Sequence, residues 1–501
     1  MSPEFPIFLT VLLALPVVGF LVVIFTPRQN VNFIKWTALI FSLATFVLSL
    51  VLLTEPFSTS ADFHFGGVVP WIPTVGITYA LGVDGMSILL VLLTTLITPV
   101  AILSSWTSIN EREKEYYAFM LLLEMGMIGV FVALDLFLFY IFWEFTLVPM
   151  YFLIGIWGGS ERRYAAIKFF LYTMAGSLLM LLAILYLGLA GGTFYLLDLI
   201  DLDIPLQTAR WLFLAFAVAF AIKVPVWPLH SWLPDAHVQA PTAGSVILAG
   251  VLLKMGTYGF VRFNLPLFPE ASAEFAPYIA ALAIIGIIYG AIVSYAQQDM
   301  KKLVAYSSVS HLGFVMLGIF SLNAIGIQGA ILQMINHGLS TGALFLLVGM
   351  IYERRHTRDM DEFGGIWRAM PVFSALSLIV TLSSMGLPGL NGFVGEFTIL
   401  LGSFNSPVLG AQPWIFTAFA TTGVILAAIY LLYMFQKVYL GPLDKPENKA
   451  LSDINVREIL TLVPLLIFIF WIGLYAAPFF NLMGPSVDAL LDTMVTAVAG
   501  L

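Results

Sequence analysis

Five ionisable residues lie inside long apolar stretches of this chain of 501 residues. They are three acids and two bases: Glu124, Glu144, Lys223, Lys254 and Glu396. At the centre of a membrane helix each costs roughly 2.5–3.5 kcal/mol, or on the order of 12–17 kcal/mol together before any pairing. Folding alone gives no reason to accept that cost. Such residues normally face a bundle interior or water and mark a path for ions or protons.

Glu144 and Lys223 are the first candidate pair for proton transfer. Pro149 cannot donate to the carbonyl four residues back, so it frees a polar backbone group beside Glu144. Pro225 and Pro228 must break the helix that contains Lys223, which leaves the lysine at the negative end of a half-helix. A buried lysine with a movable carboxylate partner is a tunable proton carrier. The alternatives are a glutamate bonded to a neighbouring helix and a lysine that reaches the membrane surface.

Lys254 and Glu396 predict a second part of the same path. Lys254 lies in the middle of an apolar segment, among small residues that allow close helix approach or water. Glu396 follows a second helix break at Pro388 and Gly389. The sequence therefore indicates two interrupted helices, each close to ionisable residues.

Four histidines extend the candidate set. His311 and His337 fall on consecutive helices with Ser, Gln and Asn nearby, which predicts a water-linked relay toward the second break. A haem site would also use a histidine pair, but other redox ligands are missing from the pattern. His230 and His237 flank the loop after the first break, and they either transfer protons or only shape that loop. Glu124 likewise either transfers protons or only bonds to a neighbouring helix.

The composition excludes several classes of protein. Hydrophobic residues make up 60% of the chain and charged residues 10%, against about 25% charged in soluble proteins. The chain has no cysteine, which excludes disulfides, thiolate metal sites and iron–sulfur ligation. A net charge of −8 with scattered bases excludes nucleic-acid binding. Phosphate-loop, dinucleotide and metal-ligand motifs are absent from the sequence, so no metal or cofactor is expected on this chain.

Long apolar segments predict an all-α polytopic membrane protein with about fourteen spans. Residues 55–80 are expected to form a long loop, 190–209 to lie along the membrane surface, and 479–501 to be too weakly apolar for a further span. The spans are expected near residues 5–26, 33–54, 81–106, 116–134, 136–157, 165–189, 210–224, 242–262, 276–297, 301–320, 325–351, 372–402, 414–440 and 458–478.

The distribution of basic residues supports this number of spans. Of the 21 lysines and arginines, 17 fall in loops after odd-numbered spans, and only Arg210 and Arg262 fall after even-numbered ones. Loops rich in Lys and Arg face the cytoplasm. Both termini should therefore lie on the opposite side, and the first apolar run should be a helix rather than a cleaved signal peptide.

The two breaks lie five spans apart, which is the pattern of inverted repeats built around a polar axis. We expect four parts: a three-helix segment at 1–115, a first inverted five-helix repeat at 116–262, a second at 276–440, and the last span with its tail at 441–501. The repeats would comprise spans 4–8 and 9–13.

Four motifs resemble one known family. They are the run from Lys223 to Lys254, Phe142-Trp-Glu-Phe, the run from Lys301 to His311, and Asn391-Gly-Phe-Val-Gly-Glu. Together they resemble the antiporter-like subunits of respiratory complex I, NADH:quinone oxidoreductase. Glu396 stands where sister subunits generally have a lysine, and the chain ends soon after its last span, which favours one subunit type within that family.

The resemblance implies a role for each candidate. Glu144 and Lys223 would form the interacting pair of a first half-channel, Lys254 would be the central lysine, and the two intramembrane histidines would lead to Glu396 as the terminal site. The chain would be part of a proton-translocating enzyme without containing its redox centre. NADH, FMN, iron–sulfur clusters and quinone would bind to partner subunits. Sister antiporter-like subunits, lipids and, indirectly, the redox arm would be its partners.

Other functions remain as alternatives. Related subunits occur in multi-subunit Na⁺/H⁺ antiporters and in proton-pumping membrane-bound hydrogenases. A purely structural spacer would have to explain five intramembrane ionisable residues, and a stand-alone solute carrier would need a polar pocket that the sequence does not indicate. We expect a bacterial inner membrane as the location, with thylakoid and mitochondrial inner membranes as the alternatives.

Overall fold

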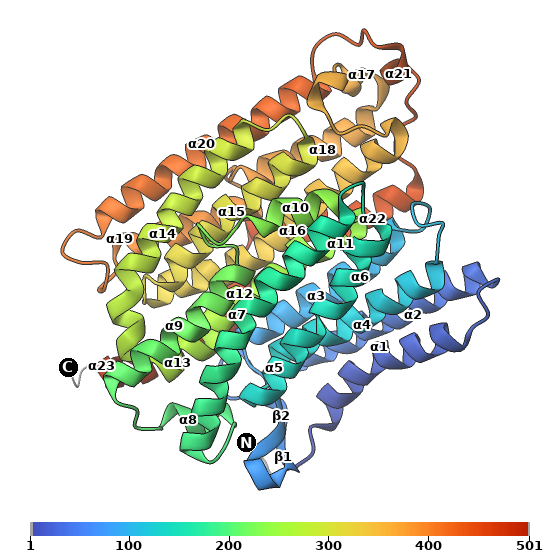
Figure 1. Cartoon of the computed structure of the whole chain (residues 1–501). Coiled ribbons are helices and arrows are strands. Elements are labelled where there is room, and N and C mark those ends of the chain that lie inside the picture. Colours follow the sequence, from blue (N-terminus) through green and yellow to red (C-terminus); the bar gives the residue numbers. More distant parts are fainter. Residues whose placement is uncertain (1–3, 499–501) are drawn as a thin grey trace.

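The computed structural model describes residues 4–498, and this part of the chain is a bundle of long helices that run side by side (Figure 1). Within it, 13 helices are long and apolar enough to cross a membrane. The apolar helix α18 (Pro371–Ser384) and the helix after it, α19 (Asn391–Phe404), are the halves of one broken span. Counted with the 13 helices, this broken span, the twelfth in chain order, brings the number of spans to fourteen, as predicted.

The long helices of the bundle keep nearly the predicted bounds of the spans. In the first half they are α1 (Ile7–Phe25), α2 (Val31–Ser49) with the 3-10 turn η1 (Leu50–Thr54), α3 (Ser87–Ser104), α4 (Glu113–Val132), α7 (Arg162–Gly191) and α9 (Leu206–Lys223). In the second half they are α14 (Pro269–Tyr295), α15 (Met300–Ile319), α16 (Ala324–Arg355), α20 (Trp414–Tyr439) and α22 (Val456–Leu474).

Both predicted helix breaks are present. The first separates α9, which ends at Lys223, from α10 (Trp232–Gln239), and it contains Pro225 and Pro228. Across it, the indole Nε1 of Trp232 donates to a carbonyl at the end of α9, at 2.8 Å. This bond satisfies one of the acceptors that a helix end leaves free. The second break contains Pro388 and Gly389, and the φ of +95° at Gly389 is a conformation that favours glycine.

The eighth span is less regular than the sequence predicts. It is built from α11 (Thr242–Ile247), the π-turn η3 (Leu248–Leu252), α12 (Leu253–Gly259), the π-turn η4 (Phe260–Asn264) and α13 (Leu265–Leu267). Its most apolar stretch is entirely buried inside the bundle. Single π-turns inside helices are frequent at functional sites. The expected regular helix over 242–262 is therefore interrupted twice.

The early loop is also more ordered than expected. Within 55–80, strand β1 (His64–Ile72) pairs antiparallel with β2 (Ile77–Val83) through the 3-10 turn η2 (Pro73–Val75). Because β2 extends to residue 83, the third span begins at Ser87 rather than near 81. The Ala80 carbonyl of β2 accepts a backbone hydrogen bond from the segment between α4 and α5 (Leu136–Phe145), at 2.9 Å.

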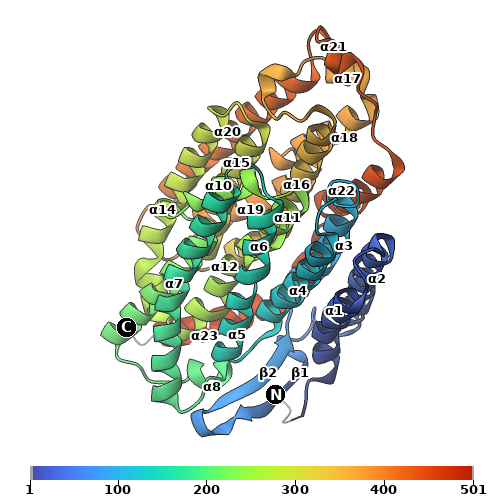
Figure 2. The ribbon, with the colours of Figure 1, turned by 45° about the vertical axis from the view of Figure 1, so that its right-hand side comes forward.

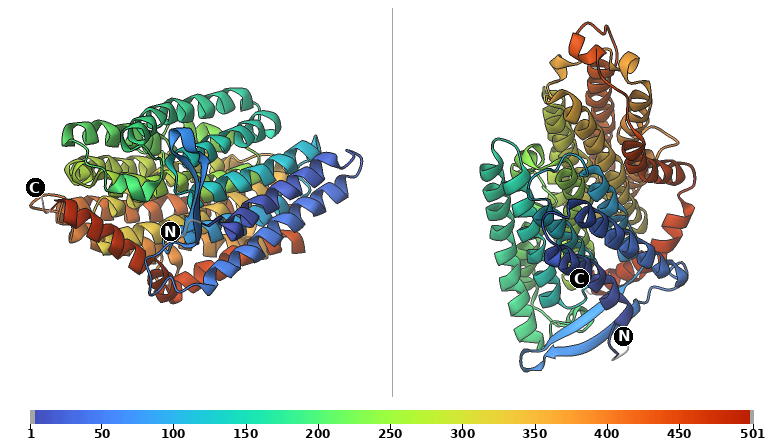
Figure 3. Two further views of the ribbon diagram at one scale, coloured as in Figure 1. Left: turned by 90° about the horizontal axis from the view of Figure 1, so that it is seen from below. Right: turned by 90° about the vertical axis from the view of Figure 1, so that its right-hand side faces the viewer.

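Residues 190–209 contain the short helix α8 (Leu196–Ile200), of which Leu196 and Leu199 are buried in the protein. The hairpin and α8 lie at one end of the bundle (Figure 2). The short helices α17 (Ile366–Ala369) and α21 (Pro446–Lys449), which carry basic residues, lie at the opposite end (Figure 3). These two basic short helices thus lie away from the hairpin, and the predicted orientation in the membrane stays a prediction.

The tail forms a helix that the sequence analysis did not predict. Helix α23 (Ala477–Val498) packs against α14 and α16 and is not among the 13 membrane-length apolar helices. The backbone N–H of Gly85 donates to Ser486 Oγ of this helix at 3.0 Å. The tail therefore covers the bundle without adding a span, and residues 499–501 of the predicted tail lie outside the described chain.

Candidate proton-transfer site

Glu144 and Lys223 meet at two helix ends. Helix α5 ends at Phe145 and α6 (Leu147–Trp157) begins two residues later, so the helix is interrupted beside Glu144 as the proline predicts. Lys223 is the last residue of α9 and is fully buried. Its ammonium lies 5.2 Å from the ring centroid of Trp143, a distance at which an aromatic face attracts a cation.

The two charged groups interact without touching. Among the described residues, the Lys223 ammonium has no hydrogen-bond acceptor and no carboxylate within 4.0 Å. The charge of Glu144 acts on Lys223 through space, and Ser177 lies beside the Glu144 carboxylate. The pair is therefore separated in this conformation, so a shift of either helix end would change the field at the lysine strongly.

Lys254 is the first member of a continuous row of polar groups. It follows directly after the π-turn η3 and is fully buried. Its ammonium donates to the carbonyl of Ala249 within that turn, and it lies 2.6 Å from Nδ1 of His337 on α16. The irregular turn and the neighbouring helix thus both hold the lysine.

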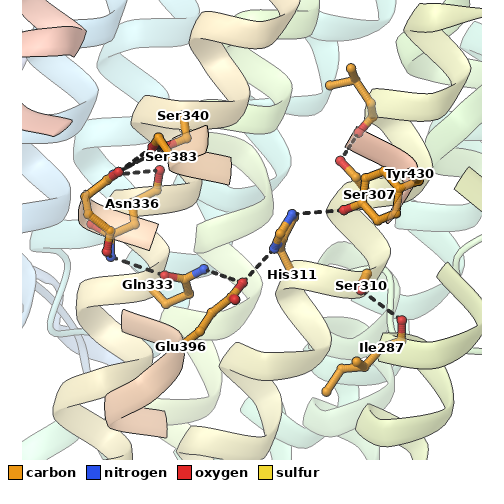
Figure 4. Close-up of polar contacts among 12 residues, drawn as sticks. Ile287, Ser307, Ser310, His311, Gln333, Asn336, Ser340, Ser383, Glu396 and Tyr430 are labelled. Carbon is orange, nitrogen blue, oxygen red and sulfur yellow. Dashed lines mark hydrogen bonds and ion pairs between the residues drawn. The ribbon is translucent and has the colours of Figure 1, made fainter. Parts of the chain in front are cut away.

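The row continues through two histidines to the second broken helix. The rings of His337 and His311 are 6.0 Å apart between centroids. His311 Nδ1 lies 2.8 Å from Glu396 Oε1, and its other ring nitrogen lies 3.2 Å from the hydroxyl of Tyr430 (Figure 4). The structure thus brings together four of the predicted residues, which are Lys254 on α12, His337 on α16, His311 on α15 and Glu396 on α19.

Amide and hydroxyl groups surround the second half of this row (Figure 4). Gln333 Nε2 donates to Glu396 Oε1 at 3.1 Å, and Asn336 Nδ2 donates to Gln333 Oε1 at 3.2 Å. Ser383 donates to the Asn391 side chain at 2.5 Å, across the second break. A cavity of about 10 Å³ among these groups also borders both histidines. That volume and polar lining suit one water molecule, which could join the two rings.

The three less certain candidates lie in different settings. His237 is fully buried, and its ring stacks on that of Phe345 with 4.6 Å between the ring centroids. Neither of its ring nitrogens has a hydrogen-bond partner in the described chain. His230 lies edge-on to Tyr289 at 5.0 Å. Glu124 is fully buried on α4, and neither of its oxygens has a hydrogen-bond partner in the described chain. The hydrogen bond to a neighbouring helix that was one alternative for Glu124 is therefore not seen.

A buried ion pair went unnoticed in the sequence. Arg262, expected in a loop, lies inside η4 with 6% of its side chain exposed, and its guanidinium is 2.5 Å from Asp84 Oδ1. The same guanidinium donates to the Tyr258 hydroxyl at 3.0 Å, and that hydroxyl donates to the Phe131 carbonyl at 3.0 Å. The expectation of a loop was wrong because Asp84, far away in sequence, neutralises the arginine.

Removing one partner of this ion pair should destabilise the protein strongly. Asp84→Asn leaves Arg262 charged and uncompensated in the interior, so we expect a loss of about 3–5 kcal/mol in the free energy of unfolding. Thermal unfolding of the detergent-purified protein measures it. Asp62→Asn, at an exposed carboxylate bonded to Ser60, is the control and should change little. Equal melting temperatures for Asp84→Asn and the wild type would contradict the expected burial cost.

Comparison with known proteins places the fold and these residues in a family. The family described as NADH:quinone oxidoreductase/Mrp antiporter, TM, matches residues 133–438. NADH-quinone oxidoreductase subunit M of Rhodobacter capsulatus is 47% identical over 93% of both chains. NADH-ubiquinone oxidoreductase chain 4 of Arabidopsis thaliana is 44% identical over 96% of both chains.

Comparison with solved structures shows the same fold in related complexes. A chain of respiratory complex I from Thermus thermophilus with bound NADH superposes with a TM-score of 0.87, at 33% identity, over 97% of this chain and 99% of that one. The Mrp complex from Dietzia shares the fold, with a TM-score of 0.81 at 24% identity over 97% of this chain and 52% of that chain. The chain therefore belongs to the NADH:quinone oxidoreductase/Mrp antiporter family, and within it to the group of complex I subunits named M in bacteria and chain 4 in plants. It is a multi-pass integral membrane protein.

Proposed function

We propose that this chain translocates protons as a membrane-arm subunit of a bacterial NADH:quinone oxidoreductase, in the inner membrane. One observation carries the proposal: buried ionisable groups form a continuous row from Lys254 to Glu396 inside a fold shared with complex I. Redox chemistry would occur in partner subunits that hold NADH, FMN, iron–sulfur clusters and quinone. This chain would use the free energy released by that redox chemistry to move protons across the membrane.

The first half of the path would act as a switch. A conformational or electrostatic change in a neighbouring subunit would move Glu144 relative to Lys223. Within the described chain, the Lys223 ammonium has aromatic rings and this through-space charge to stabilise it but no hydrogen-bond acceptor, so withdrawal of the carboxylate favours release of its proton. Lys254 would receive that proton. All three residues fall within 116–262, which we take as the first inverted repeat.

The second half would conduct the proton onward. A histidine ring accepts a proton at one nitrogen and donates from the other, so His337 and His311 can pass a proton between Lys254 and Glu396. Gln333 and Tyr430 hold the orientation of Glu396 and His311 by hydrogen bonds. His311, His337 and Glu396 fall within 276–440, the second proposed repeat.

Purification of the chain in its native assembly tests the function. A tag on this chain, mild detergent and identification of the co-purifying proteins should recover NADH-oxidising subunits with iron–sulfur centres and sister antiporter-like subunits. The assembly, returned to lipid vesicles, should pump protons when NADH reduces quinone. Recovery of small membrane subunits alone, with Na⁺/H⁺ exchange that needs no electron donor, would establish the antiporter function instead.

A further inference from the structure

A polar pocket opens at the end of the bundle that carries the basic loops. It has a volume of about 490 Å³ and lies where α15 begins and α16 ends. Its lining includes Asp299, Lys302, His356, Arg358 and Asp359. Asp299 and Arg358 form an ion pair at 3.2 Å and are each about one quarter exposed. Titratable groups that exchange protons with water therefore lie in this pocket.

Lys301 follows two residues after Asp299, whose side chain accepts a hydrogen bond from the Lys301 backbone N–H at 2.7 Å. The sequence places it in a loop, but it is the second residue of α15 and only 6% exposed. Its ammonium donates to the carbonyl of Ala240, at the end of α10, at 2.5 Å. The charges of both Asp299 and Arg358 act on it. A buried lysine thus stands between the pocket and the short helix that follows the first break.

His237 connects this lysine to the candidate path. It lies in the last turn of α10, three residues before the carbonyl that Lys301 bonds, and both its ring nitrogens are free of partners in the described chain. The charges of Lys301 and Lys254 both act on its ring. No step of the proposed transfer from Glu144 to Glu396 uses Lys301 or this histidine.

We propose that Lys301 is the proton-uptake site of this chain. The Asp299 carboxylate takes a proton from water in the pocket and passes it to the neutral Lys301 amine, and the Lys301 ammonium then passes a proton to a ring nitrogen of His237. His237 then releases a proton from its other nitrogen toward Lys254, so each step moves one proton and leaves the donor free to be reloaded. This inference rests on the proposed function and adds a second route by which the central lysine is filled, from the side of the basic loops, besides the transfer from Lys223.

Two substitutions separate proton transfer from a structural role. Lys301→Arg keeps a positive charge and a donor for the Ala240 carbonyl, but arginine does not release its proton in proteins. Lys301→Gln keeps a donor without the charge. We expect both variants, in the whole complex reconstituted in vesicles, to lose more than half of the protons pumped per electron. NADH oxidation with an artificial electron acceptor should stay unchanged. Lys449→Gln, at an exposed lysine outside the pocket at the same end of the bundle, is the control and should pump normally.

The outcomes distinguish this inference from the function on which it rests. Normal pumping by Lys301→Arg, in a complex whose Lys223→Ala variant does not pump, would overturn the uptake site and leave the proposed function intact. Loss of assembly in both Lys301 variants, with Lys449→Gln assembled, would also overturn it, because Lys301 would then be structural. Normal pumping by Lys223→Ala would refute the proposed function itself.

Discussion

Lys254→Met is expected to stop proton transfer through this chain without weakening the fold. Methionine is unbranched and of similar length, and replacing a buried charge by an apolar group is often neutral or stabilising. It cannot carry a proton, so transfer from Lys254 to His337, now 2.6 Å apart, loses its donor. Loss of a positioned proton donor slows a proton-transfer step by roughly 100-fold or more. Dye-detected acidification of vesicles during NADH oxidation measures the pumping, and thermal unfolding measures the stability.

The matched control for this experiment is another buried lysine. Lys35 on α2 is 7% exposed and donates to the Trp106 carbonyl at 2.8 Å, but it lies outside the row of polar groups. Lys35→Met should therefore leave the protons pumped per electron unchanged. If the two variants pump equally well, Lys254 is not on the path.

Glu144→Gln should remove most coupled pumping by a different mechanism. Glutamine keeps the shape of the side chain but removes the Glu144 carboxylate, whose charge acts on Lys223 within the described chain. Within the described chain, Lys223 then has no carboxylate partner whose movement can change the proton affinity of its amine. Lys223→Ala should have an equally large effect, and the double variant should be no worse than either single one, because residues that act as a unit are not additive. The measurement is the ratio of protons pumped to electrons transferred.

Glu274→Gln provides the control at a surface carboxylate. Glu274 pairs with Arg210 at 2.7 Å with 42% of its side chain exposed, so its contribution to stability is about 0.2–1 kcal/mol at most. It should pump as the wild type does. A near-normal ratio for Glu144→Gln or Lys223→Ala would show that the pair is structural.

The sequence predicts the spans and the breaks well because both depend on local chemistry. A membrane span requires about twenty apolar residues, and a proline removes a donor wherever it occurs. The burial of Lys223, Lys254 and Glu396 follows from their apolar neighbours in the chain. The proximity of His337 to Lys254 and of His311 to Glu396 was an expectation about consecutive helices, and the geometry agrees with it. Their roles in proton transfer stay predictions.

What the sequence does not reveal depends on contacts between distant segments. The hairpin at 64–83 was predicted as a loop because its proline and glycine content hides two short strands. Arg262 was counted as a loop base because its partner Asp84 lies 178 residues away. Lys301 was counted in the same way, although the Ala240 carbonyl that it bonds is 61 residues away. Tyr430 lies in an apolar stretch of α20, so no local pattern marks it as a partner of His311.

The π-turn over Leu248–Leu252 also makes the position of Lys254 sensitive to the number of residues before it, and not only to their types. Successive residues of an α-helix are turned by about 100° around its axis. Deletion of a single residue from this turn would let it close as an ordinary helical turn at little cost in hydrogen bonds. Every side chain on one side of the deletion would then rotate relative to the other side, and Lys254 would point away from His337. A substitution in this segment that keeps its packing would therefore leave Lys254 facing His337, whereas an insertion or deletion there would uncouple the two halves of the path.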